Sequence, residues 1–403
     1  MNSLGEATLF RMTPDALWLM GFGLVPAVLA CWLGTPAPAA RGAWCFGAAA
    51  SQLGALGVFG VQHGGFFLLS WEMMSLGGAV MILGERRSAA PGMPVLFMLG
   101  LLEVGAVALL VAVLLLAMPA QNLGFAAFVG GAAGLPVWLR DLIGVLLHLA
   151  GHALAKGALF LTADGVLAAT GSYAIGHALL ARRSAFVFGA GALFAGMSLA
   201  AMPPQAGFVS EWYVFQTVFQ GFHLPDLAGR LTLALAGAGL ALTAAIAFAT
   251  FVKVLGIGLF GGGARIAAVP PARSTAAVGL LGAAVLALAV GMPVWLPALA
   301  GAASVRFSSE APHLMHDGWL LVPLTASFAF ISPSLLVIVM PLLALLPGSL
   351  LLLSARRYPI RRVPVWYGGS HPDPQRTATT ALTFSNALRT FYSFIYRPRI
   401  ETT

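Results

Sequence analysis

About ten stretches of some 20 predominantly apolar residues follow one another along this 403-residue chain, and they limit its possible folds more than any other feature. A helix needs about 20 residues to cross the hydrocarbon core of a bilayer, where every backbone polar group has to be satisfied within the protein. We therefore predict an all-α, polytopic transmembrane helix bundle of about ten spans. They are expected near residues 15–34, 43–62, 65–84, 95–117, 141–167, 185–202, 206–222, 231–260, 275–299 and 331–354.

The composition supports a membrane protein and argues against nucleic-acid binding. Hydrophobic residues make up 59% of the chain and charged residues 8%, with a mean hydropathy of +0.91, whereas soluble domains have about 25% charged residues. The net charge of +8 is local, because residues 355–403 alone contribute +6 through eight arginines. Arginines after a last span are typical of a cytoplasmic face, so this basic tail is predicted to be cytoplasmic.

Several segments depart from a simple straight span. Residues 118–140 are interrupted by Gly and Pro and are expected to form half of a discontinuous helix. The stretch 231–260 is too long for one straight span, which predicts tilt or a break. Residues 300–330 are predicted to be an extramembrane loop, and residues 378–396 a surface-lying amphipathic helix.

The chain offers no ligand set for a redox cofactor or metal. Its two cysteines, Cys31 and Cys45, lie within or beside apolar runs, and no CxxC, CxxCH or Cys/His cluster occurs. His148 and His152 have the HxxxH spacing, but Leu149 stands where the zinc protease motif needs glutamate. We therefore predict no cofactor, no metal and no catalytic redox centre in this chain.

The two lysines, Lys156 and Lys253, both lie inside long apolar stretches. An ion at the bilayer centre costs roughly 2.5–3.5 kcal/mol on the insertion scale, so such residues point to function. His148 and His152 precede Lys156 at intervals of four, which places all three on one helix face. Since imidazoles titrate near neutrality, this face is a candidate proton relay, and we expect it to point toward the bundle interior. The alternative is a polar helix–helix contact.

Carboxylates in other apolar stretches are further candidates for a proton path. Glu72 lies well inside its span, and a buried carboxyl prefers to be neutral unless it is paired. A static salt bridge is the alternative for Glu72 and for Lys253. Glu103, Asp164 and Glu211 are weaker candidates, for which helix packing or an interfacial position is the alternative.

Five sequence blocks resemble the antiporter-type membrane subunits of respiratory complex I. They are SWEMMSL, LHLAGHALAKGALFLTADGVL, MPPQAGFVSEW, TFVKVLGIGLFGG and SFAFISPSLLVIVM. They are most similar to the large membrane subunit of group 4 membrane-bound hydrogenases and formate hydrogenlyase, as is the ending FSNALRTFYSFIYRPR. The resemblance implies a proton path through Glu72, His148, His152, Lys156 and Lys253, with Glu103, Asp164 and Glu211 as possible additions.

The chain also departs from this family. It is shorter, a block is missing between about residues 130 and 145, and the family's usual lysine partner for Glu72 is replaced by Gly131, Ala132 or Ala133. The resemblance thus implies a truncated antiporter-like inverted-repeat fold. We divide it into N-terminal helices of an incomplete first repeat (1–140), the His/Lys helix with the C-terminal helices (141–354), and the basic tail (355–403).

The resemblance further implies a subunit of a hydrogenase- or complex I-like oxidoreductase in a bacterial inner membrane, taking part in proton translocation. Its partners would be the bilayer, other membrane subunits and a cytoplasmic redox arm with nickel–iron and iron–sulfur centres. Two alternatives remain open. The first is a non-conducting structural subunit of such a complex, and the second is a standalone cation/proton antiporter.

Overall fold

A computed structural model describes the chain in several ranges. They are residues 9–33, 40–85, 92–120, 122–125, 142–171, 185–260, 269–295, 315–316, 320–321 and 331–355, with Gly369 and Phe384. The chain forms two compact units. The first comprises Met1–Ala153 and Pro297–Pro312, and the second comprises Leu154–Leu296 and His313–Thr403. Each unit is described separately, and the predicted division at residues 140 and 354 stays a prediction.

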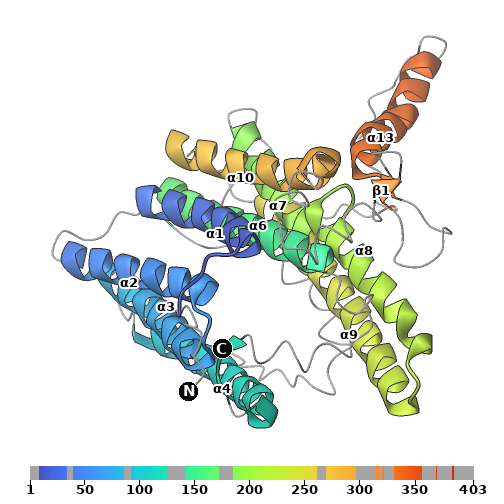
Figure 1. Ribbon diagram of the computed structural model, residues 1–403. Coiled ribbons are helices and arrows are strands. Elements are labelled where there is room, and N and C mark those ends of the chain that lie inside the picture. The colour runs from blue at the N-terminus through green and yellow to red at the C-terminus, as the bar shows by residue number, and fades with distance from the viewer. Residues whose placement is uncertain are drawn as a thin grey trace, which may run out of the picture. The chain divides into compact units, whose positions relative to one another are not determined.

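The first unit is built from long apolar helices (Figure 1). They are α1 (Pro14–Leu33), α2 (Arg41–Gly60), α3 (Gly64–Glu85), α4 (Gly92–Ala120) and the beginning of α6 (Leu142–Thr170). α2 and α3 approach each other at small residues: a Cβ on Gly54 would lie 2.5 Å from the Met74 nitrogen, and one on Gly77 would lie 2.5 Å from the Ser51 nitrogen. Small residues at such crossings let two membrane helices touch along their backbones.

The second unit continues α6 and adds shorter and longer helices. These are α7 (Phe186–Leu199), α8 (Ala206–Phe219), η4 (Gln220–His223), α9 (Leu227–Phe251), η5 (Val252–Leu259), α10 (Ala272–Val290) and α13 (Pro333–Ala355). Its core lies where α7 packs on α10, because Phe188, Ala192, Val278, Leu281 and Val285 are fully buried there. Two short strands, β1 (Met315–His316) and β2 (Leu320–Leu321), pair antiparallel.

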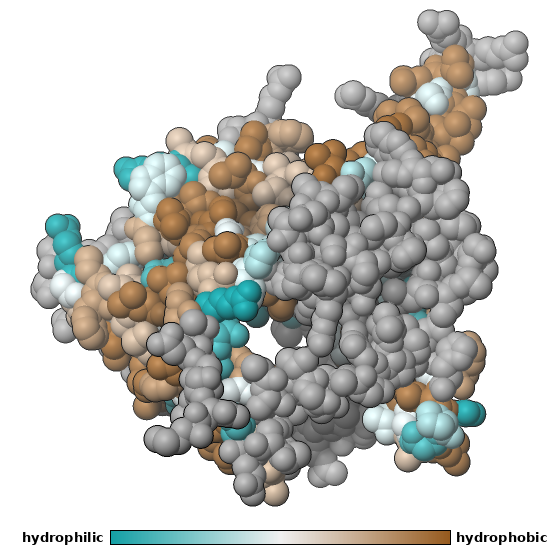
Figure 2. Space-filling model, in the orientation of Figure 1, coloured by the Kyte–Doolittle hydropathy of each residue, from teal (hydrophilic) through white to brown (hydrophobic). Residues whose placement is uncertain are grey.

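The prediction of an all-α polytopic bundle is confirmed. The described residues contain seven helices that are long and apolar enough to cross a membrane: Ala16–Leu33, Arg41–Gly60, Gly64–Gly84, Leu146–Thr170, Leu227–Leu259, Ala272–Val290 and Pro333–Ser354. α7 and α8 have only 14 residues each, which is short of the 20 or so that a straight span needs. Hydrophobic side chains cover much of the described surface that is visible in Figure 2.

The stretch 231–260, for which the sequence predicts tilt or a break, changes its helix type. α9 is regular to Phe251 and passes directly into η5, which is a π-helix. Of residues 118–140, α4 continues to Ala120 and Gly124 forms an isolated bridge with His63, while residues 121 and 126–140 lie outside the described residues. The tail lies outside them as well, apart from Ala355, Gly369 and Phe384, so its predicted surface helix and cytoplasmic location stay predictions.

Candidate functional site

α6 carries the row of titratable side chains that the sequence predicts. Leu142–Thr170 is one continuous helix, so His148, His152 and Lys156 follow one another by about one turn each. The two imidazole rings lie 5.8 Å apart between centroids and are inclined by 31°. This spacing allows a single water molecule or a small ring movement to connect the two imidazoles.

This row lies on the exposed side of α6. His152 and Lys156 are exposed and His148 is half-exposed, while the opposite side is buried by residues such as Leu147, Leu154 and Ala158, which are at most 1% exposed. The predicted position of this face toward the bundle interior stays a prediction.

Glu72 and Glu103 are brought together in the first unit. Glu72 lies on α3 and Glu103 on α4, and their carboxyl groups are in side-chain hydrogen-bonding contact. Two carboxylates this close repel each other when both are ionised. The structure thus brings two acidic side chains from α3 and α4 together.

Lys253 lies at the helix break in the second unit. It is the second residue of η5 and is half-exposed. A π-helix widens the helical turn and leaves backbone groups less regularly paired, and such turns are frequent at functional sites. The sequence predicted a break in this stretch, but only the structure shows that the break coincides with Lys253.

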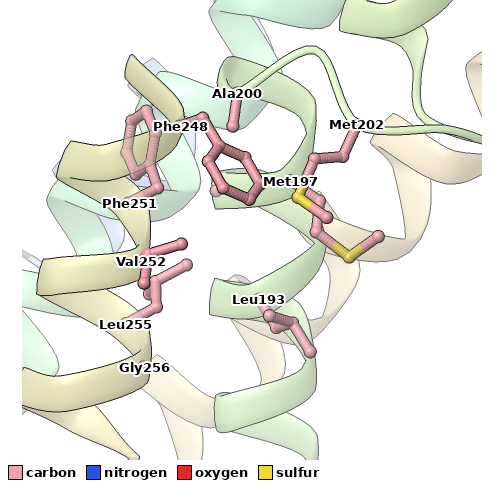
Figure 3. A pocket seen from close by; sticks show the side chains of 10 residues that line it. Leu193, Met197, Ala200, Met202, Phe248, Phe251, Val252, Leu255 and Gly256 are labelled. Atoms are coloured by element: carbon pink, nitrogen blue, oxygen red, sulfur yellow. The ribbon is translucent and has the colours of Figure 1, made fainter. Parts of the chain in front are cut away.

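The neighbouring Val252 lines an apolar cavity between α7 and α9–η5 (Figure 3). The cavity has a volume of about 220 Å³, and its walls are formed by aliphatic, aromatic and methionine side chains together with two glycines. Cavities of this kind stay dry because a water molecule would find no hydrogen-bonding partners in them. The residue that precedes Lys253 therefore faces an apolar wall.

Asp164 and Glu211 take separate positions. Asp164 is half-exposed, two turns beyond Lys156 on α6. Glu211 is half-buried on α8. His148 thus lies beside His152 on α6 and Glu72 lies beside Glu103 in the first unit, whereas the other ionisable residues lie on other turns and helices.

The sequence reasoning missed a buried polar row on α8 beside Glu211. Ser210 and Tyr213 are completely buried, and Gln216 is 4% exposed. Their spacing of three residues places them on one side of α8, and the Ser210 hydroxyl donates to the Gly207 carbonyl at 3.0 Å. The repeated polar positions in SEWYVFQ are the signal that could have found this row. Its hydroxyl and amide groups can carry hydrogen bonds through an otherwise apolar helix layer.

A family model and several known proteins match this chain. Residues 139–227 match the family described as NADH:quinone oxidoreductase/Mrp antiporter, transmembrane. Hydrogenase-4 component B of Escherichia coli (strain K12) is 28% identical over 357 residues, covering 82% of this chain and 53% of that protein. Formate hydrogenlyase subunit 3 of the same organism is 35% identical over 120 residues, covering 30% and 20%.

A solved structure supports the fold over nearly the whole chain. It is a chain of the membrane-bound sulfane sulfur reductase, an archaeal respiratory membrane complex, with a TM-score of 0.65 and 19% identity, covering 98% of this chain and 83% of that chain. The chain spans about half the length of hydrogenase-4 component B. The family match includes all of α6, α7 and α8. Residues 139–227 thus match the antiporter family model, and most of the chain is similar to hydrogenase-4 component B.

Proposed function

We propose that this chain is a proton-translocating membrane subunit of a hydrogenase- or complex I-like oxidoreductase. The observation that carries the proposal is the row on α6, where His148, His152 and Lys156 occupy one face of an apolar helix inside the matched family segment. Ionisable groups in a membrane helix are costly, and they are typical of ion and proton pathways.

In this proposal the Glu72–Glu103 pair loads a proton and the α6 row passes it on. When the two carboxyl groups share a proton, a positive charge that approaches favours release of that proton. The imidazoles of His148 and His152 accept and donate protons near neutral pH. Lys156 and Lys253 supply positive charges whose protonation responds to their surroundings, with Asp164 and Glu211 as additional positions.

The exposed row needs a protein or water-filled environment in the membrane. Lipid around Lys156 would cost roughly 2.5–3.5 kcal/mol, so we propose that another segment or a neighbouring membrane subunit covers this face. The names of the related proteins support a multi-subunit complex. We further propose a cytoplasmic redox arm that holds nickel–iron and iron–sulfur centres, a bacterial inner membrane location, and a cytoplasmic tail at residues 355–403.

A structural, non-conducting subunit is the second candidate. It is favoured by the outward position of His152 and Lys156, because the described residues leave both side chains exposed. The alignment with hydrogenase-4 component B also supports this candidate. The alignment is 357 residues long, but only 82% of this 403-residue chain is aligned, so this chain has gaps where the relative has residues. A standalone cation/proton antiporter would use the same residues without a redox partner.

The test is proton uptake by inverted membrane vesicles that contain the assembled complex, followed with a pH-sensitive dye during substrate oxidation. A proton path predicts that Lys156→Ala and Lys253→Ala each lower the uptake at least tenfold, because alanine cannot bind a proton. Phe160→Ala is the matched control, since Phe160 is an exposed residue one turn beyond Lys156 and cannot titrate.

Assembly is measured in parallel by co-purification of the accompanying subunits. Normal proton uptake in both lysine variants, with normal assembly, would refute conduction and leave the structural candidate. Uptake that persists without any redox substrate and depends on a sodium gradient would instead support the standalone antiporter. The identity of the co-purifying subunits decides whether nickel–iron and iron–sulfur proteins accompany the chain.

A further inference from the structure

A groove opens between α8, η4 and α9, away from the α6 row. It has a volume of about 580 Å³. One wall is aromatic, with Phe215, Phe219 and Phe222, and the facing wall on α9 consists of alanine and glycine. Figure 1 shows α8 and α9 running side by side as a helical hairpin. The small side chains of α9 leave a furrow that the phenylalanine rings border.

Gly237 closes the bottom of this groove. A Cβ at that position would lie 2.5 Å from Cγ1 of Val218, so α8 and α9 touch there. Ala234, Ala238 and Ala241 follow at helical spacing and are all exposed. The furrow thus has a narrow bottom and an open side, which suits a long, thin apolar group.

Arg230 lies at the mouth of the groove and is its one charged lining residue. Its Nε donates to the Leu224 carbonyl at 2.7 Å, which holds the guanidinium in place and leaves its terminal amino groups available. The nearby Asp226 is the N-cap of α9, and its carboxylate accepts from the Gly229 nitrogen. Asp226 does not line the groove, so the mouth itself is positively charged.

The dimensions match one leaflet of a bilayer. Arg230 is the fourth residue of the span that begins at Leu227, where a long basic side chain reaches the interface. From Arg230 to Ala241 the helix rises by about 16 Å at 1.5 Å per residue, which is about half of a 30 Å hydrocarbon core. The groove therefore leads from headgroup level toward the middle of the bilayer.

We propose that this groove binds an anionic phospholipid, with the phosphate at Arg230 and one acyl chain along Ala234, Ala238 and Ala241. Basic pockets between membrane helices bind anionic headgroups in this way. A helix of a partner protein fits less well, because a cylinder 10 Å wide and 16 Å long needs about 1,250 Å³. The site is independent of the proposed proton path.

Native mass spectrometry of the purified full chain, with its accompanying subunits, tests this proposal. Phosphatidylglycerol and phosphatidylcholine are titrated separately, and the fraction of chain with one retained lipid is measured. Phosphatidylglycerol is expected to bind at least fivefold more tightly than phosphatidylcholine, and Arg230→Gln is expected to remove this preference, because one basic contact near the surface is worth about that factor.

Two matched controls separate a site from general lipid adhesion. Arg273→Gln removes an exposed arginine from the first turn of α10, outside the groove. Ala238→Leu fills the furrow, whereas Ala236→Leu adds the same bulk to an exposed position that does not line it. The proposal requires that Arg230→Gln and Ala238→Leu weaken phosphatidylglycerol binding and that both controls bind like the unaltered chain.

Equal binding of the two lipids, or equal losses in the variants and their controls, would overturn the proposal. It would also be overturned if the assembled complex retained no lipid at this site and a partner subunit cross-linked to a cysteine placed at Ala238. None of these outcomes depends on proton uptake.

Discussion

Replacing Gly191 by alanine should weaken the contact that holds the second unit together. A Cβ on Gly191 of α7 would lie 2.4 Å from the Val278 carbonyl oxygen of α10 and 2.9 Å from the Gly279 Cα. On the other helix, a Cβ on Gly282 would lie 2.5 Å from the Gly191 Cα. The two backbones therefore meet directly, and no flexible side chain is present that could move aside.

The size of the effect follows from this geometry. Ordinary contact begins near 3.4 Å, so the helices have to separate by about 1 Å. A gap of that size forfeits a quarter to a half of each dispersion contact, and forced overpacking costs about 1–3 kcal/mol. Alanine returns up to about 1 kcal/mol through its helix propensity. We expect Gly191→Ala to lower the free energy of unfolding by about 1 kcal/mol.

The assay is unfolding of the detergent-solubilised chain by titration with a denaturing detergent, followed by tryptophan fluorescence. Gly239→Ala is the matched control, because nothing lies within 4 Å of a Cβ at Gly239 on α9. That variant should be as stable as the unaltered chain or slightly more stable. The reasoning would be refuted if Gly191→Ala proved at least as stable as Gly239→Ala.

Gly191→Ala should also affect the functional site on α6. α6 packs on this core through Gly165, where a Cβ would lie 2.7 Å from the Phe188 ring and 3.2 Å from the Ser274 Cβ. A shift of α7 against α10 therefore displaces the support of α6. Proton uptake should fall with stability in Gly191→Ala, and normal uptake would show that α6 keeps its place independently of this contact.

Three further predictions concern the acidic pair, a helix cap and the tail. Glu103→Gln should preserve assembly but lower proton uptake, because an amide can hydrogen bond to Glu72 without exchanging a proton; unchanged uptake in vesicles would exclude the pair from the path. Asp226→Ala should cost about 1 kcal/mol of unfolding free energy, as expected for loss of an N-cap, and an unaltered denaturation midpoint would contradict that role. Protease should leave residues 355–403 intact in right-side-out vesicles and remove them in inverted ones, and cleavage from the outside would reverse the proposed orientation.

Features that lie within one helix were predictable from the sequence. The α6 row follows from intervals of four residues and a helical turn of 3.6. The break near Lys253 follows from an apolar stretch of 231–260 that exceeds the thickness of the bilayer. The buried row of Ser210, Tyr213 and Gln216 is present in the sequence as a spacing of three residues, but only the charged Glu211 was predicted in this segment.

Contacts between helices depended on the tertiary structure. The partner of Glu72 is Glu103 on α4, and nothing in the sequence around either residue specifies the other. The exposed position of Lys156 was equally unpredictable, because helical spacing shows which residues share a face but not what that face meets. In a soluble protein the apolar face of a helix points inward, but lipid is as apolar as a protein core. Hydrophobicity therefore determined that this chain enters the membrane, whereas side-chain shape, through glycines such as Gly191 and Gly282, decided which helix faces meet.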